Sequence, residues 1–272
     1  MVARDGDGFC FALPPSLGQV PVRDLARRLA DVLYGIGFST VVPMTSYEQL
    51  ERALLSGEVD AAWGPPIVCA RVEDAGGLAA LRSVRYGAVT YRSVVLCRTG
   101  DRLDLRHLEL RQLEPSANAA RPVRAAWVDP RSMGGYILAR HHLRSRGIEP
   151  RRAFVHEKML GSYAACFQAV LSGEADVTAS YASRRGLGYV ELLGEHAFEL
   201  RVLAYTGECP NDALVLSPQL SAADAATLVG GLRRLVAHPA SLALLASLFG
   251  VDNFDRPPAA TYSPLLSLLE AS

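Results

Sequence analysis

Residues 45–66 read TSYEQLERALLSGEVDAAWGPP and contain the signals for one helix, one strand and one turn. Ser46 and Gln49 have the spacing of a capping box, which predicts that a helix begins there, and Gly57 is a typical helix-ending residue. The apolar segment VDAAW (59–63) then predicts a strand that runs into the turn Gly-Pro-Pro. The segment therefore predicts a helix followed by a strand, which is the repeating unit of an α/β protein.

The flanking sequence repeats this alternation. Strands are predicted at GFCFALP (8–14) and FSTVVPM (38–44), and a long β-rich segment at AVTYRSVVLC (88–97). Between the first two strands, VRDLARRLADVLYGIG (22–37) places its apolar residues on one helical face. Strands separated by helices of this length imply parallel pairing through right-handed crossovers.

After a polar segment at 101–122, which is loop-like toward its end, the alternation begins again. Further strands are predicted at VRAAWVD, RRAFVH and ADVTAS (123–129, 151–156 and 175–180), with helices at 134–146 and 162–173. Two extended segments, RVLAYTGE (201–208) and DALVLS (212–217), and two more helices follow; the helices are capped by Ser221 and begun by Pro239. This order predicts lobe 1 over 1–92 plus 206–272, lobe 2 over 93–205, and two chain crossings that form a hinge.

The charge balance and the cysteines exclude several classes of partner. The 272 residues include 28 Lys and Arg and 28 Asp and Glu, so no net charge attracts nucleic acid. A site for an anion must therefore be built from a few groups that lie close together. The five cysteines are widely spaced, lack CxxC or Cys/His clusters, and are mostly flanked by apolar residues: Cys10, Cys69, Cys97, Cys166 and Cys209. They predict reduced core residues, with no metal and no cofactor.

Targeting signals are missing at the start of the sequence. Asp5 and Asp7 interrupt the place where a leader needs a continuous apolar stretch, and Pro14-Pro15 follows. No run approaches the roughly 18 apolar residues of a membrane span. We therefore expect a cytoplasmic protein, or a periplasmic or lipid-anchored one if a leader precedes Met1 in the native gene.

Three predicted helix starts combine a strand end, a small-residue turn and a hydroxyl: 45–47, 129–136 and 161–163. The N-terminus of a helix presents unpaired N–H groups and partial positive charge, so it binds anions without basic side chains. Each serine at these starts also has a simpler interpretation as an N-cap.

Five motifs follow one another between about residue 45 and residue 220. They are the segment 45–66 already quoted, YRSVVLCRTGD (91–101), WVDPRSMGGYILARHHLRSRGIEP (127–150), GSYAACFQAVLSGEADVTAS (161–180) and GECPNDALVLSP (207–218). In order and spacing they resemble the phosphate/phosphite/phosphonate substrate-binding proteins of ABC transporters.

The resemblance implies a two-lobed type 2 periplasmic-binding fold, each lobe a mostly parallel sheet flanked by helices. It also implies an oxyanion held between the two helix starts of lobe 2, with two tyrosines closing over it and an aspartate near a ligand amine. The ligand-binding residues implied are Tyr47, Tyr91, Ser132, Met133, Gly134, Gly135, Ser162, Tyr163 and Asp176.

The sequence departs from the family pattern at both helix starts. The family's Ser-Thr-Ser-Gly reads Ser132-Met133-Gly134-Gly135 here, and its Gly-Ser-His ends in Tyr163. Because the site has fewer hydroxyl donors and no imidazole, the identity of the anion stays open. The ligand could be a different small anion or an acid with an apolar body.

The leading functional hypothesis is therefore non-catalytic binding of a small anion. Such a protein serves as a transport receptor with an ABC permease, or as a cytoplasmic ligand sensor with a regulatory protein. The alternative is a cytoplasmic enzyme on the same fold, of the kind that makes menaquinone or thiamine precursors. Its acid/base candidates would be His156, Glu157 and Asp176, none with a recognisable partner.

Overall fold

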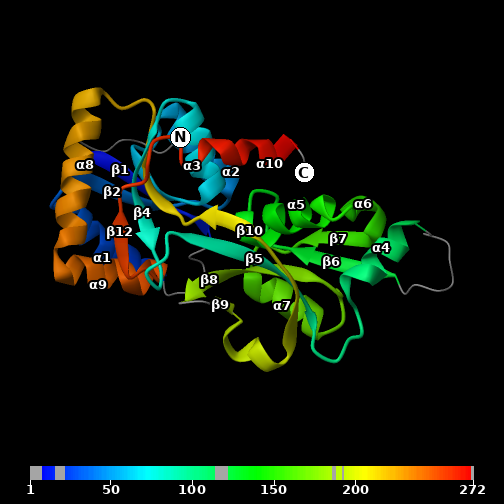
Figure 1. Cartoon of the computed structure of the whole chain (residues 1–272). Helices are drawn as coiled ribbons and strands as arrows, with labels where there is room; N and C mark the ends of the chain where they lie inside the picture. Colours follow the sequence, from blue (N-terminus) through cyan, green and yellow to red (C-terminus); the bar gives the residue numbers. More distant parts are fainter. Residues whose placement is uncertain (1–7, 16–21, 114–121, 186–187, 192, 271–272) are drawn as a thin grey trace. The chain divides into compact units, whose positions relative to one another are not determined.

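The computed structural model describes residues 8–15, 22–113, 122–185, 188–191 and 193–270. The acidic segment 1–7, which carries the argument about export, lies outside these residues. The chain divides into two compact units (Figure 1). Unit 1 comprises Met1–Val89 with Pro210–Leu266, and unit 2 comprises Thr90–Cys209 with Ser267–Ser272.

Unit 1 contains a six-stranded sheet in the order β12-β4-β11-β3-β1-β2. Its strands are β1 (Phe9–Leu13), β2 (Phe38–Pro43), β3 (Ala61–Gly64), β4 (Leu78–Val84), β11 (Ala213–Leu216) and β12 (Asn253–Asp255). β1 pairs in parallel with β2 and β3, as the βαβ pattern predicts. β11 and β12, which belong to the segment that returns to unit 1, pair antiparallel with their neighbours. The sheet is therefore mixed, and the expectation of a mostly parallel sheet is wrong in this respect.

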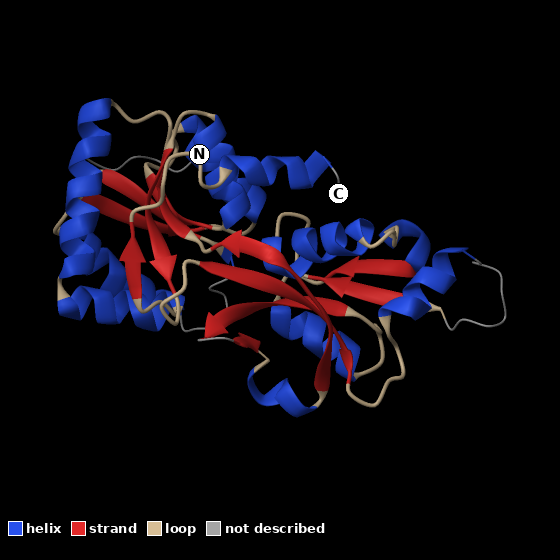
Figure 2. Cartoon of the chain, viewed as in Figure 1, coloured by secondary structure: helices blue, strands red, loops and turns tan. Residues whose placement is uncertain are grey.

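Helices surround this sheet (Figure 2). They are α1 (Val22–Tyr34), α2 (Tyr47–Ser56), α3 (Pro66–Asp74), α8 (Ala222–Ala237), α9 (Pro239–Phe249) and the short η4 (Ser263–Leu266). The predicted caps are confirmed for α2, where the Ser46 side chain accepts from the Gln49 N–H and Gly57 has a φ of 73°. The Gln49 amide oxygen accepts from the N–H of Thr45 instead of Ser46, so the capping box is displaced by one residue.

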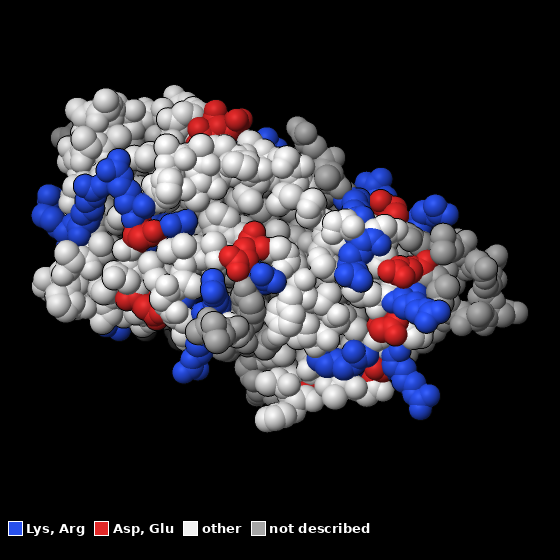
Figure 3. All heavy atoms as spheres, in the orientation of Figure 1, with Lys and Arg blue, Asp and Glu red and all other residues white. Residues whose placement is uncertain are grey.

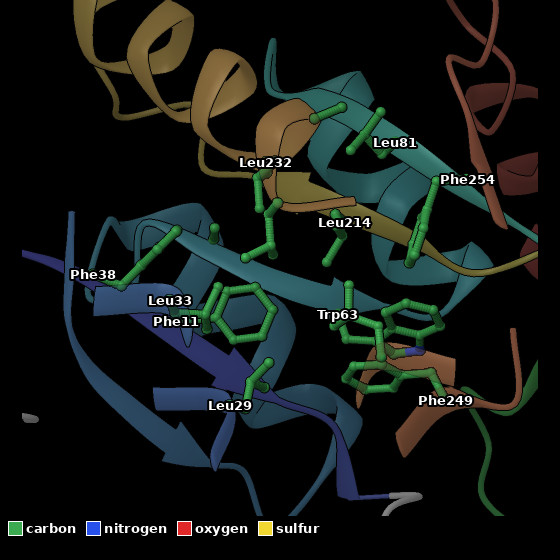
Figure 4. Close-up of a cluster of buried hydrophobic side chains, with 14 of the residues drawn as sticks. Phe11, Leu29, Leu33, Phe38, Trp63, Leu81, Leu214, Leu232, Phe249 and Phe254 are labelled. Carbon is green, nitrogen blue, oxygen red and sulfur yellow. The ribbon is translucent and has the colours of Figure 1, made fainter. Parts of the chain in front are cut away.

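The core of unit 1 centres on aromatic side chains from distant parts of the chain (Figure 4). The Trp63 ring stacks on Phe249, with ring centroids 3.9 Å apart and planes within 6°. Phe254 packs edge-on against the same indole. Each aromatic side chain removes a large apolar area from water, so these contacts bind helix α9 and strand β12 to Trp63 at the centre of the sheet.

Unit 2 contains a four-stranded sheet in the order β10-β5-β8-β9 and a parallel pair, β6-β7. The strands are β5 (Thr90–Arg98), β6 (Val123–Trp127), β7 (Phe154–Met159), β8 (Thr178–Arg185), β9 (Gly188–Glu191) and β10 (Leu200–Pro210). β5 and β8 are antiparallel, and a parallel bridge from Ala125 to Val177 links β6 to the residue before β8.

The helices of unit 2 are α4 (Leu105–Leu113), η2 (Met133–Ile137), α5 (Leu138–Ser145), α6 (Pro150–Ala153), α7 (Tyr163–Leu171), η3 (Gly194–Phe198) and α10 (Ser267–Glu270). The predicted helix at 134–146 is therefore present, but its first turn, η2, is a π-helix. The predicted strand at 151–156 begins only at Phe154, because Pro150 at the first helical position starts a short helix instead.

One motif occurs in both units. Residues 46–60 (SYEQLERALLSGEVD) and 162–176 (SYAACFQAVLSGEAD) share Ser-Tyr at the beginning and Ser-Gly-Glu-x-Asp at the end. In each unit the serine caps a helix, a glycine with positive φ follows it, and the aspartate is buried. The two units therefore use the same local solution to pass from a helix to the next strand.

Among the described residues, no single helix is both long and apolar enough to cross a membrane; α8 and α9 meet that test of length and composition only together, as a pair bent by 93°. Figure 3 shows basic and acidic side chains interspersed over the face in view. All five cysteines are buried and remain thiols, as predicted.

Candidate ligand-binding site

The two helix starts of unit 2 follow the two strands of its parallel pair. Ser132 comes after β6 and Ser162 after β7, so both helices begin at the carboxyl edge of the pair. Backbone bonds join the two connecting loops: Leu160 N–H donates to Trp127 O and Gly161 N–H to Val128 O, each at 2.8 Å. The fold therefore brings together the two segments that the sequence singled out.

The serines at these starts are N-caps. Ser132 Oγ accepts from Gly135 N at 3.1 Å, and Ser162 Oγ accepts from Ala165 N at 3.2 Å. Ser46 in unit 1 caps α2 in the same way. A hydroxyl oxygen that accepts a bond still carries its own proton, so capping leaves each serine able to donate to a ligand.

The first turn of η2 leaves donors unused. The wide turn is held by Ile137 N–H, which donates to Ser132 O at 3.0 Å, five residues back. In the described part of the chain, the N–H groups of Met133 and Gly134 find no acceptor. Unpaired N–H groups at a helix N-terminus carry partial positive charge and suit an oxyanion.

Three tyrosines surround Gly134. A Cβ placed on Gly134 would lie 3.0 Å from Tyr163 Oη, 3.1 Å from Tyr181 Cβ and 3.4 Å from Tyr91 Cε2. The Tyr181 ring packs edge-on against both other rings, with centroids 5.4 Å from Tyr163 and 6.2 Å from Tyr91. Glycine is thus needed here for the close approach of the rings, which form an aromatic wall beside the helix start.

Two other residues of the predicted set belong to the packing of this turn. A Cβ on Gly135 would lie 2.5 Å from Val128 Cγ2, so this glycine lets the helix sit against the strand end. The Met133 side chain is 2% exposed. Both side-chain positions therefore face the interior of unit 2.

Asp176 is held by Arg124. Its Oδ2 accepts from the Arg124 backbone N–H at 2.8 Å and from Nε at 3.0 Å, while Oδ1 accepts from Nη2 at 3.1 Å. The ion pair raises the pKa of Arg124, chiefly through the side-chain hydrogen bond. This carboxylate, which is 1% exposed, is therefore engaged within the scaffold.

The acid/base candidates of the enzyme alternative are also engaged or exposed. Glu157 Oε2 accepts from Trp127 Nε1 at 2.7 Å and forms an ion pair with the buried Arg140. His156, next to it on β7, is exposed. Among the residues that the structure describes, no group of three or more His, Cys, Asp or Glu side chains could hold a metal ion.

Sequence reasoning missed two residues beside the helix start. Tyr181 lies on β8 directly opposite Ser93 on β5, and both face the side of the sheet that carries η2. Ser93 lies in the motif YRSVVLCRTGD (91–101) but is not among the ligand-binding residues that the resemblance implies. Tyr181 directly follows the predicted strand ADVTAS (175–180), and this place at the strand end is the signal that could have found the third tyrosine.

The comparisons with known proteins identify the family of the chain. Residues 21–262 match the family described as the periplasmic substrate-binding protein of the phosphonate ABC transporter. The chain belongs to this family. The family resemblance predicted from the five motifs is thereby confirmed. No curated protein matches the sequence.

Solved structures show the same fold at low sequence identity. PhnD1 from Prochlorococcus marinus, in complex with methylphosphonate, has a TM-score of 0.75 and 14% identity, with 97% of each chain covered. A binding component of an ABC phosphonate transporter from Pseudomonas aeruginosa has a TM-score of 0.75 and 19% identity, with 96% of this chain and 86% of that chain covered. A Xanthomonas citri protein bound to ATP has a TM-score of 0.71 and 16% identity, over 96% and 95%. The α/β periplasmic-binding-protein fold is confirmed.

Family membership decides the general role. Members are non-catalytic substrate-binding proteins that work with the permease components of ABC transporters, so the enzyme alternative is set aside. The family is described as periplasmic, and the expectation of a cytoplasmic protein has no support from these comparisons.

Proposed function

We propose that the chain binds a small phosphorus oxyanion, namely phosphate, phosphite or a short phosphonate, and delivers it to an ABC permease as a transport receptor. The supporting observation is the first turn of η2, where the N–H groups of Met133 and Gly134 are unpaired in the described structure beside the start of α7. A phosphorus oxyanion presents several acceptor oxygens and no donor when fully ionised, which matches a site made of donors.

The donors proposed for this ligand are backbone groups and hydroxyls. The hydroxyls of Ser132 and Ser162 flank the two helix starts, and the Tyr163 phenol lies next to Gly134. A phenol donates as an imidazole does, so Tyr163 can supply the bond that the family's histidine supplies. Tyr91, on β5 of the same unit, completes the proposed set within unit 2; Tyr47 begins α2 in unit 1 and stays a prediction from the family resemblance.

The aromatic wall supports a ligand with a small substituent. Tyr91, Tyr163 and Tyr181 all come within 3.4 Å of a Cβ placed on Gly134. A methyl group or a hydrogen on phosphorus would fit against such a surface with less displacement than a long chain. The structurally similar Prochlorococcus marinus protein was solved with methylphosphonate, a ligand of this size.

Titration calorimetry of the purified chain tests the proposal. Phosphate, phosphite and methylphosphonate are titrated separately, with sulfate and acetate as controls for non-specific anion binding. We expect at least one phosphorus oxyanion to bind with a dissociation constant below about 1 mM, more tightly than either control. The proposal is wrong if none of the three binds while a carboxylic acid or an aromatic metabolite does.

A further inference from the structure

Ser93 is a fully buried residue that joins three segments of unit 2. Its hydroxyl donates to the Gly134 carbonyl oxygen at 2.6 Å. Its backbone N–H donates to Thr206 Oγ1 on β10 at 2.9 Å. Thr206 is itself buried, and its hydroxyl donates to Gly207 O at 2.9 Å. One serine thus connects the helix start of η2 to two neighbouring strands.

The contact falls on the turn that departs from α-helical geometry. Ile137 N–H reaches back to Ser132 O, and Leu138 N–H reaches back to Met133 O, so each bond spans five residues. A side chain that inserts into the hydrogen-bond ladder of a helix is a recognised cause of such departures. The Ser93 hydroxyl gives the Gly134 carbonyl a partner from outside the helix.

The Ser93 contact is made from an interior strand of the sheet. β5 lies between β10 and β8 in its sheet, so Ser93 belongs to an interior strand. The chain leaves unit 1 between Val89 and Thr90 and returns to it between Cys209 and Pro210, so β5 and β10 are the two crossing strands. Ser93 therefore fixes the helix start to both of them.

We propose that Ser93 is a positioning residue for the anion site, acting through Gly134. This inference rests on the proposed function. By holding the Gly134 carbonyl, Ser93 keeps the first turn of η2 wide, with the N–H groups of Met133 and Gly134 presented in a fixed arrangement. A preorganised set of donors binds more tightly than one that must be ordered by the ligand.

The test compares Ser93→Ala with Ser180→Ala. Ser180 is equally buried and lies on the paired strand β8, but it faces the other side of the sheet, because Val94 is its partner in register. Among described residues its hydroxyl has no hydrogen-bond partner, so its removal leaves η2 untouched. Both variants lose one buried hydroxyl.

Two measurements are made on each variant: affinity for methylphosphonate by calorimetry, and hydrogen exchange of the Ile137 and Leu138 amides without ligand. We expect Ser93→Ala to weaken binding by about fivefold to tenfold and to speed both exchanges, because the wide turn loses its outside partner. Ser180→Ala should change neither.

Each alternative result is informative. Faster exchange with unchanged affinity would overturn the inference, since Ser93 would then only stabilise the helix. Unchanged exchange, or an equal loss of affinity in Ser180→Ala, would overturn it as well. If the wild-type chain binds neither methylphosphonate nor any other phosphorus oxyanion, the proposed function fails, and the inference that rests on it fails too.

Discussion

Asp60 and Asp176 occupy the same position in the two units and make the same backbone contact. Asp60 Oδ2 accepts from Cys10 N at 2.8 Å, and Asp176 Oδ2 accepts from Arg124 N at 2.8 Å. The backbone of each aspartate also donates to the same residue: Asp60 N–H to Cys10 O at 2.9 Å, and Asp176 N–H to Arg124 O at 2.8 Å. Each aspartate therefore fastens the end of its Ser-Gly-Glu-x-Asp motif to the neighbouring strand.

This pairing predicts that Asp176→Asn destabilises the chain without weakening anion binding. The amide keeps one acceptor oxygen but loses the charge opposite Arg124, so we expect the free energy of unfolding to fall by about 1–3 kcal/mol. Urea denaturation measures this loss, and Asp60→Asn is the matched variant in unit 1.

Calorimetry with methylphosphonate and 2-aminoethylphosphonate distinguishes a purely structural role of Asp176 from a role in ligand binding. Both affinities should stay near wild type in Asp176→Asn. A selective loss for the amine-bearing ligand, with stability intact, would show instead that Asp176 contacts a ligand amine, as the family resemblance implies.

For Ser132→Ala we expect two losses. Affinity for the bound oxyanion should fall by about 1.5–3 kcal/mol, the size of a hydrogen bond to a charged group. Stability should fall by about 1 kcal/mol, because the Gly135 N–H loses its cap. Ser221→Ala is the control: Ser221 Oγ accepts from Asp224 N at the same 3.1 Å, but it caps α8 in unit 1. Ser221→Ala should lose stability but keep its affinity for the oxyanion. If Ser132→Ala binds the oxyanion as tightly as Ser221→Ala does, Ser132 only caps the helix.

The regular parts of the fold could be predicted because local signals were strong there. Helix α2 begins after Ser46 and ends before Gly57, and α9 begins at Pro239, as the sequence predicted. Helix α3 was not predicted, since Pro66 reads as part of a turn although it is also a favoured first residue of a helix. The antiparallel pairing of β11 depends on where the returning chain enters the sheet, which no local pattern records.

The sequence predicted which segments form the candidate site, but not how these segments are arranged. The motifs marked Ser132, Ser162 and Tyr163, and the structure brings their two helix starts together through the bond from Gly161 to Val128. The π-helical turn of η2 could not be predicted, because its outside partner, Ser93, lies about forty residues earlier in the chain. Long-range contacts of this kind leave no periodic signal.

The thiol of Cys166 gives a prediction about pH. Cys166 lies on α7 within an apolar cluster, and burial raises the pKa of its thiol to about 11 from the usual 9.0. Below the ordinary pKa both folded and unfolded chains hold the proton, so the stability is fully present there. As pH rises from 9 toward 11 the unfolded chain ionises first, and stability falls.

Iodoacetamide at pH 8 should therefore label Cys166 in urea but not in the native chain, as read by mass spectrometry of its peptide. Cys166→Ala should also lose less stability between pH 9 and pH 11 than the wild-type chain does. Rapid labelling of the native chain would mean that this thiol is accessible and that α7 opens readily.

The adjacent glycines of η2 should respond differently to the same substitution. In Gly134→Ala the new methyl meets the tip of Tyr163 and Cβ of Tyr181, and it lies beside the two unpaired N–H groups. We expect a loss of affinity of about tenfold or more and a smaller loss of stability than in Gly135→Ala, because both contacts are 3.0 Å or longer and the phenol can move. In Gly135→Ala the methyl meets Val128 Cβ at 2.8 Å, next to the backbone, so stability should fall by about 1–3 kcal/mol. Calorimetry and thermal unfolding of both variants decide the matter: if Gly134→Ala binds as tightly as wild type, the first turn of η2 is not where the ligand lies.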